Sequence, residues 1–254
     1  MAITIKKPEE LEVLREAGKR LGSVLRAVAF AAKPGVTPSV LDALAERLIR
    51  EGGDLPAFKN YKPDGAKIAF PSTLCVSVNN AVVHGIPGEV PLAEGDVVGL
   101  DLGLIHKGLF VDAAVTVPIG KVDEKAEKLI SRTREALALG IAAARGGGKV
   151  GDIGAAVEQY INQFGYGIVR ELAGHGVGYK VHEEPFVPNY GLAGTGPKLV
   201  PGMVLAIEPM VNEGGDEVRL APDKFTFVTT DGSRSAHFEH TIIITEGAPE
   251  VITK

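Results

Sequence analysis

The sequence contains one cysteine, no tryptophan and three methionines. Because Cys75 has no partner cysteine in the chain, an internal disulfide is excluded, which favours a reducing compartment. No apolar run approaches the roughly 20 residues that a membrane helix needs, and the residues after Met1 lack the apolar core of a signal peptide. We therefore expect a cytoplasmic protein that has no membrane partner.

The chain also has no excess of positive charge. The formal net charge is −5, and the lysines and arginines are dispersed rather than clustered, which argues against direct nucleic-acid binding. Glycine is abundant instead: 32 of the 254 residues are glycine, which predicts many tight turns and close backbone approaches. A chain of this length can bury a full core, and we expect a monomer with a single domain over residues 1–254.

Apolar residues recur every three or four positions in four segments, which predicts four amphipathic helices. Their starts carry proline, acidic or capping residues, and their ends carry glycine or proline. The predicted helices begin at Pro8, Thr37, Asp123 and Asp152, and stop at Pro34, Gly52, Gly146 and Gly165. Short apolar runs broken by glycine, proline and asparagine fill the rest, and these predict strands.

The order of two helices followed by strands occurs twice. An offset of 112 positions pairs Gly35 with Gly147 and Glu46 with Glu158, which suggests an internal duplication with halves of about 8–120 and 121–254. The expected fold is α+β: two pseudo-twofold halves join their strands into one curved antiparallel sheet, with four helices on its convex side. A site is then expected on the concave face where the halves meet.

Two aspartates stand inside apolar runs in the first half. Asp101 lies within residues 97–104 and Asp112 within residues 109–117, and the turn signal Lys107-Gly108 separates the runs. A lone carboxylate buried in such a run costs several kcal/mol or gives up its charge. The pattern therefore indicates two neighbouring antiparallel strands that direct both carboxylates at one cation. On these residues alone, a pair of aspartates in turns at strand ends is an equal alternative.

The second half adds further polar groups in apolar or glycine-rich settings. Each has an ordinary explanation alone: Glu208 could cap a helix or form a salt bridge, and His182 could be a surface histidine. His237 and His240 are expected to be structural or supporting residues, and His106 a solvated turn residue. The additional groups are His175 between Gly174 and Gly176, His182, Glu208 after Ile207, and Glu239 after Phe238.

Taken together, the polar groups point to metal ions. Four carboxylates inside apolar strands repel one another unless a polyvalent cation neutralises them. Two aspartates, one histidine and two glutamates suit two divalent ions roughly 3.5–4 Å apart that share bridging carboxylates. These donor types favour Mn, Fe, Co or Zn over a metal that prefers thiolates, without choosing among the four.

The complete set of motifs resembles the dinuclear metallopeptidases of the pita-bread fold. Two longer stretches, Asn79-Asn80-Ala81-Val82-Val83-His84-Gly85-Ile86-Pro87 and residues 175–185, are similar to the type I methionine aminopeptidases. The resemblance runs over essentially the whole chain. The long insertion of type II enzymes has no room between His182 and Glu208, and the zinc-finger extension of eukaryotic relatives is missing, so the chain resembles the short bacterial form.

The resemblance implies a role for each group. Asp101 would chelate one metal and Asp112 would bridge both, while His175 together with Glu208 would bind the metal that fills first, and Glu239 would bridge. Glu208 would also act as general base and later acid toward a metal-activated water. His182 would stabilise the charge that develops on the scissile carbonyl, and His84 would hydrogen-bond the amide of the second substrate residue.

The expected methionine pocket departs from the family pattern. By position it contains Phe70, Cys75, Val181 and Phe225, and the last two replace larger aromatic residues. Residues 67–71 replace the usual Tyr-His-Gly-Tyr-Pro, and Gly99 and Gly103 flank the first aspartate unusually. These departures leave open the shape of the pocket and the presence of a nearby monovalent-cation site.

The resemblance implies an enzyme that removes the initiator methionine from nascent chains with a small second residue. It would use two divalent ions, drawn from Co, Mn, Fe and Zn, and would contact the ribosome transiently. Two alternatives remain: an Xaa-Pro peptidase of the same fold, and a non-catalytic pita-bread protein that binds the ribosome or RNA. The first usually carries an extra N-terminal domain, and the second usually loses metal ligands.

Overall fold

The computed structural model describes residues 2–62 and 68–254. Within these residues the predicted helices are all present. They are α1 (Pro8–Ala31), α2 (Pro38–Glu51), α3 (Glu124–Ala143) and α4 (Val150–Ile161), with the short 3₁₀ turn η1 (Asn162–Phe164) after the last.

The helix starts follow from side chains that accept free backbone N–H groups. The Thr37 hydroxyl accepts from the N–H of Val40 at 3.4 Å, and an Asp123 carboxylate oxygen accepts from Ala126 at 2.8 Å. The predicted start of the fourth helix was wrong by two residues. Asp152 lies inside the first turn of α4, and its carboxylate accepts from the backbone N–H of Lys149 at 2.7 Å.

The strands of the first half lie between α2 and α3, and those of the second half follow α4. The first set is β1 (Leu55–Pro56), β2 (Leu74–Val78), β3 (Ala81–Val83), β4 (Val97–His106) and β5 (Leu109–Pro118). The second set is β6 (Gly167–Ile168), β7 (Gly174–Gly176), β8 (Glu183–Val187), β9 (Val204–Ile207), β10 (Met210–Asn212), β11 (Val218–Leu220), β12 (Phe227–Thr229), β13 (Ser235–His237), β14 (Glu239–Ile243) and β15 (Glu250–Val251).

One large antiparallel sheet joins strands from both halves. In the described part of the chain its order is β1-β4-β5-β14-β9-β7-β8, with β2 paired to β4 and β15 paired to β14. Strands β4 and β5 form the predicted hairpin, and the turn residues Lys107 and Gly108 both have positive φ, at 48° and 82°. The remaining strands form two smaller sheets, with the orders β13-β10-β6 and β11-β12-β3.

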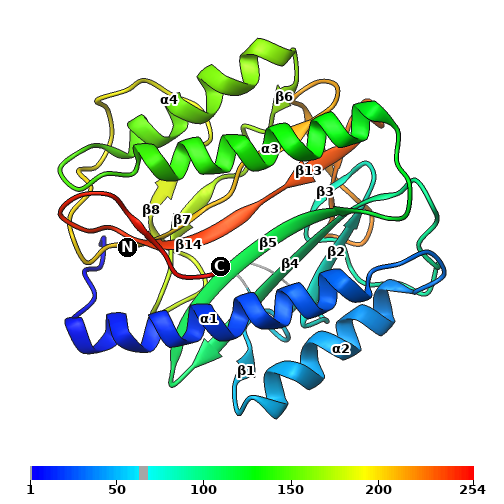
Figure 1. Ribbon diagram of the computed structural model, residues 1–254, viewed down its shortest axis with the longest axis horizontal. Coiled ribbons are helices and arrows are strands. Elements are labelled where there is room, and N and C mark those ends of the chain that lie inside the picture. Colours follow the sequence, from blue (N-terminus) through cyan, green and yellow to red (C-terminus); the bar gives the residue numbers. More distant parts are fainter. Residues whose placement is uncertain (1, 63–67) are drawn as a thin grey trace.

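The helices cover one face of the large sheet, as expected for this α+β fold. Figure 1 shows α1 and α2 crossing the strands of the first half, and α3 and α4 crossing those of the second. Buried residues of α1 and α2 pack on β2, β4 and β5, while those of α3 and α4 pack on β9 and β14. The opposite face is left for polar groups. The duplication behind this repeated order stays a prediction.

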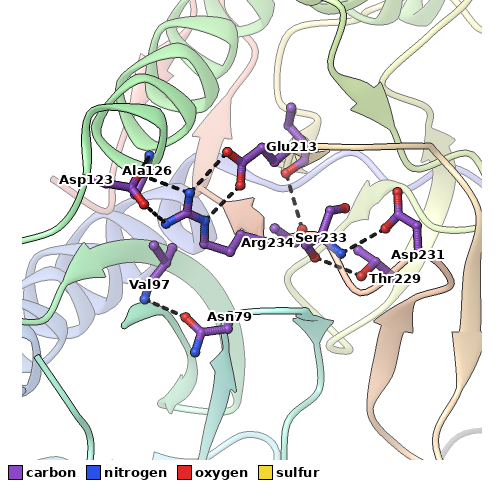
Figure 2. A network of polar contacts seen from close by, with 11 residues as sticks. Asn79, Val97, Asp123, Ala126, Glu213, Thr229, Asp231, Ser233 and Arg234 are labelled. Carbon is purple, nitrogen blue, oxygen red and sulfur yellow. Dashed lines mark hydrogen bonds and ion pairs between the residues drawn. The ribbon is translucent and has the colours of Figure 1, made fainter. Parts of the chain in front are cut away.

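An arginine directly before β13 contacts the start of α3 in the same half. Arg234 contacts the carboxylate of Asp123 through Nη1 and Nη2 at 2.9 and 3.0 Å, and that of Glu213 through Nε and Nη2 at 2.8 and 3.1 Å (Figure 2). These charge-assisted contacts raise the pKa of Arg234 and hold the pKa of Asp123 at about 2.

The expectation for His106 was wrong, because it is not solvated. Its Nδ1 lies 2.6 Å from an oxygen of Asp54, and only 7% of the residue is exposed. Arg20 of α1 approaches the other oxygen of Asp54 at 3.4 Å. Strand β4 runs to the hairpin turn under α1, so its last side chain is covered. Among the described residues, no helix is both long and apolar enough to cross a membrane.

Replacing Arg234 with methionine tests its effect on Asp123. The pKa of Asp123 is expected to rise from about 2 toward its ordinary value of 3.8, because its hydrogen-bonded cation is lost. A lowered carboxyl pKa stabilises the fold above pH ~4, and this contribution is lost as the pH falls through about 2. Carbon-13 NMR titration of the carboxyl gives the midpoint. The control Lys128→Met, which breaks the exposed pair with Glu124, should leave it unchanged.

Candidate metal centre

Five neighbouring strands each bring one predicted metal ligand to the site. In the sheet, β4, β5, β14, β9 and β7 lie next to one another in that order. Because these strands come from both halves of the chain, the ligand set is complete only when the halves join. The residues are Asp101 on β4, Asp112 on β5, Glu239 on β14, Glu208 directly after β9, and His175 on β7.

The strand register directs these side chains to one face. Asp101 pairs with Ala114, and Ala114 also pairs with Glu239. Asp112 lies two residues from Ala114, and side chains two residues apart on a strand share a face. His175 pairs with Ala206, two residues before Glu208. The alternative of two turn aspartates is wrong, since both aspartates lie inside ten-residue strands.

The ligand atoms converge. Asp112, His175 and Glu239 each offer one atom within 4.8 Å of the others. Glu208 reaches this group through Oε1, which lies 3.4 Å from Nε2 of His175, and Asp101 lies close enough that, besides burial, the charge of Asp112 raises its pKa. All five side chains line one pocket.

Unpartnered oxygens in this pocket fit a bound cation. Asp101 Oδ1, Asp112 Oδ1 and Glu239 Oε1 are buried and have no hydrogen-bond partner among the described residues. A buried oxygen without a partner is costly, and no described residue that lines the pocket is a lysine or arginine. Divalent cations supply the missing positive charge, and oxygen with one imidazole is a donor set that they accept. The residues present therefore fit the two metals that the sequence predicts.

Burial and mutual repulsion shift the pKa of every carboxyl in the cluster upward. Burial, and then the charge of Glu208, raises the pKa of Asp112 to about 8. Burial raises the pKa of Glu208 to about 8 as well. The pKa values of Asp101 and Glu239 also lie well above the ordinary range, because of burial and the neighbouring carboxylates. Without a cation, the cluster holds protons at neutral pH.

The histidines are neutral at neutral pH. Burial lowers the pKa of His175 to about 3 and that of His84 to about 4. Nδ1 of His175 lies 2.9 Å from the carbonyl oxygen of Gly176. Because a carbonyl only accepts hydrogen bonds, Nδ1 carries the proton, and the lone pair of Nε2 faces the carboxylates.

The four residues expected to bind methionine lie together beside the carboxylates. Phe70, Cys75 and Val181 belong to one buried apolar cluster, and Phe225 packs against it. The rings of Phe70 and Phe225 meet edge to face, with centroids 5.4 Å apart. His84 and His182 also line the pocket, and His182 is exposed near its opening.

Two residues of the site, Phe58 and Tyr61, were missed in the sequence, whereas His237 was expected to support it. Phe58 and Tyr61 line the pocket, and the hydroxyl of Tyr61 lies 3.0 Å from Nδ1 of His182. His237 Nε2 lies 3.2 Å from Glu208 Oε2, which agrees with a supporting role. No motif marks Phe58 or Tyr61, because they follow a two-residue strand and meet His182 only in the fold.

The two unusual glycines, Gly99 and Gly103, differ in whether the structure has room for a side chain at their positions. A Cβ atom at Gly103 would lie 2.6 Å from Cε1 of Phe58 and 2.8 Å from Cβ of Ala57, so the Phe58 ring requires glycine there. A Cβ atom at Gly99 would lie 3.6 Å from its nearest neighbour, in ordinary contact. Gly103 therefore shapes the pocket, whereas Gly99 does not. Lys67, the first of the departing residues 67–71, lies outside the described residues.

Comparison with known proteins gives one consistent family. The sequence profile of metallopeptidase family M24 matches residues 12–246. A methionine aminopeptidase of Clostridium perfringens is 44% identical over 251 residues, covering 99% of this chain and 98% of that protein. Methionine aminopeptidase 1 of Bacillus subtilis is 42% identical over 252 residues, covering 99% of each.

Solved structures agree with this. The crystal structure of the methionine aminopeptidase of Thermotoga maritima matches with a TM-score of 0.95 and 43% identity, over 100% of both chains. A prolidase of Pyrococcus horikoshii matches with a TM-score of 0.78 at 24% identity, over 98% of this chain and 63% of that one. The prolidase match concerns the fold alone.

The raised carboxyl pKa values predict how stability depends on pH. A carboxyl whose pKa is raised on folding stabilises the fold below its ordinary pKa, and this contribution is lost as the pH rises through the folded value, here about 8 for Asp112 and Glu208. In a chelator, the melting temperature should therefore fall by several degrees between pH 6 and pH 9. Calorimetry measures this. Asp112→Asn should reduce the slope, and a saturating divalent metal should remove it; an unchanged slope in both would contradict the prediction.

Proposed function

The chain belongs to metallopeptidase family M24, and we propose that it removes the N-terminal methionine from new polypeptides whose second residue is small. The observation that carries the proposal is the five-strand ligand set beside an apolar pocket. The identity of 40–46% to curated methionine aminopeptidases along nearly the whole chain supports it.

Five residues would hold two divalent ions in this site. Asp101 would chelate one ion and His175 with Glu208 the other, while Asp112 and Glu239 would bridge them. When bound, such ions act as Lewis acids and lower the pKa of water. The free α-amino group of the substrate would lie against them, which restricts cleavage to the first residue.

Glu208 is the proposed general base. It is one of the two glutamates at the site, and its oxygens contact His175 and His237 at 3.4 and 3.2 Å. In this position the carboxylate would take a proton from the attacking water and deliver it to the leaving amine. The neighbouring histidines are buried and neutral, with their pKa values near 3, so they do not compete for the proton.

His182 and His84 would hydrogen-bond the substrate at and next to the peptide bond that is cleaved. His182 stands at the pocket opening with Nδ1 held by Tyr61, and it would donate a hydrogen bond to the oxyanion that forms on the carbonyl. His84 is neutral at neutral pH because burial lowers its pKa to about 4. It would hydrogen-bond the amide of the second residue.

The apolar cluster beside the carboxylates would accept the methionine side chain. Phe58, Phe70 and Phe225 offer ring surfaces, and a thioether packs well against aromatic rings. The identity of the metals, a monovalent cation, ribosome contact, the monomeric state and the cytoplasmic location stay predictions.

Peptide hydrolysis by the metal-loaded protein tests the function. Met-Gly-Met-Met should release methionine, whereas an Xaa-Pro peptide and a peptide beginning with leucine should be cleaved slowly or not at all. Each of Co, Mn, Fe and Zn is tried separately. Preferential cleavage of the Xaa-Pro peptide would favour the prolidase-like alternative, and no hydrolysis or metal binding would favour the non-catalytic one.

Replacing Glu208 with glutamine should lower kcat roughly 10²–10⁴-fold, because the amide cannot accept the proton. Far-ultraviolet circular dichroism should be unchanged, since the two side chains have the same shape. The control Glu184→Gln changes an exposed glutamate near the pocket and should keep full activity. A variant at Glu208 that retains normal kcat would refute the assigned role.

Replacing Gly103 with alanine should weaken methionine binding. The new Cβ displaces the Phe58 ring, and a change of this size in an apolar pocket alters KM roughly tenfold. The matched control is Gly99→Ala on the same strand, where the new Cβ would be in ordinary contact with its nearest neighbour at 3.6 Å. Steady-state kinetics with Met-Gly-Met-Met measures both, and equal KM values in the two variants would contradict this account of the pocket.

A further inference from the structure

The segment that carries His182 is organised around the carboxylate of Glu183. The Oε1 atom of Glu183 accepts the backbone N–H groups of Tyr179 and of Lys180, the latter at 3.0 Å. These bonds close residues 179–183 into a compact loop that follows β7 and ends on the first residue of β8. His182, next to Glu183, therefore depends on this carboxylate for its place.

The other oxygen of Glu183 is held by residues from the opposite end of the chain. The Nζ atom of Lys6 lies 2.7 Å from Oε2, and the hydroxyl of Thr4 donates to the same atom at 2.5 Å. Lys6 also hydrogen-bonds to Thr4. The two charged side chains are only 1% and 4% exposed, and Figure 1 shows the segment before α1 passing beside β7 and β8.

The loop closes tightly over Lys6. Its ammonium lies 4.6 Å from the centre of the Tyr179 ring. A Cβ atom at Gly178 would lie 2.3 Å from Cε of Lys6, and Gly178 has a φ of +140°, so only glycine fits there. The backbone N–H of Lys6 donates to the carbonyl of Gly202 at 2.9 Å. This bond fixes the backbone of Lys6 beside Gly202, independently of the contacts that its side chain makes with the loop.

Stability alone does not account for this ion pair. A buried ion pair adds little folding stability compared with a well-packed apolar pair, because both charges must leave water. It does, however, specify one geometry for the side chains that form it. The proposed chemistry requires such precision at His182, because its ring must meet the substrate carbonyl. On the other side, Tyr61 holds the ring through Nδ1 at 3.0 Å.

We infer that Lys6 is a positioning residue, which acts through Glu183 to hold His182 where it contacts the scissile carbonyl. This inference rests on the proposed function and deepens it. Lys6 touches neither the metal ligands nor the pocket, so its effect must pass through the 179–183 loop.

The variant Lys6→Met keeps the length of the side chain and removes the ion pair. In the metal-loaded protein we expect kcat for Met-Gly-Met-Met to fall about 10- to 100-fold, the range for a displacement of about 1 Å. KM and metal affinity should change little, because the ligands and the methionine pocket are untouched. Lys6→Arg, which retains a cation, should recover part of the loss.

A mutant cycle separates positioning from a general structural effect. If Lys6 acts through His182, then Lys6→Met should change kcat little in a protein that already carries His182→Ala. A full 10- to 100-fold loss in both backgrounds would overturn the inference. The matched control Arg15→Met breaks another long-range ion pair near the start of the chain, with Glu250, and should leave kcat unchanged.

Hydrogen–deuterium exchange gives a readout that needs no activity. Residues 179–183 should exchange faster in Lys6→Met and not in Arg15→Met, and unchanged exchange would overturn the inference. Should Lys6→Met fail to fold, Thr4→Val removes one bond to Glu183 and should cause the same changes in smaller measure. If the wild-type protein cleaves no peptide, the proposed function fails, while exchange still reports whether Lys6 holds the loop.

Discussion

Repulsion among four buried carboxylates is the constraint on which this structure depends. Asp101, Asp112, Glu208 and Glu239 stand on adjacent strands and share one pocket, and the described lining offers no basic side chain to offset them. The chain therefore brings together carboxyl groups that no basic side chain of the described lining offsets, so their raised pKa values leave them partly protonated unless a cation binds. The free energy for this arrangement has to come from elsewhere in the molecule.

That free energy comes from the opposite face of the sheet. The helices bury large apolar side chains there, and burial contributes about 25 cal/mol per Å². Side-chain hydrogen bonds also tie the strands at the junction of the halves. Thr241 exchanges two bonds with the backbone of Asp112, at 2.7 and 3.0 Å, and Thr116 does the same with His237, at 2.7 and 2.9 Å. These bonds, together with the helix packing, connect the strands that carry the ligands.

Much of the fold could be read from local patterns. The helices and the β4–β5 hairpin follow from periodicity and from Lys107-Gly108, since neighbouring residues decide them. The convergence of Asp101 and Asp112 with Glu208 and Glu239 was also expected, because a carboxylate buried alone in an apolar strand is costly and a shared cation removes that cost. The contact of Tyr61 with His182, the burial of His106 and the role of Gly103 were not expected. Each depends on a contact between residues that are distant in the chain, and such contacts cannot be predicted from local sequence patterns.

The place of β14 between β5 and β9 sets the order in which the site can be assembled during synthesis. The β4–β5 hairpin can form as soon as its turn is made, so Asp101 and Asp112 come together early. Thr241, which ties β14 to Asp112, follows 129 residues later. A chain that has not yet been extended to β14 lacks Glu239 and therefore has an incomplete ligand set. The five-residue ligand set is complete only when β14 pairs with β5 and β9.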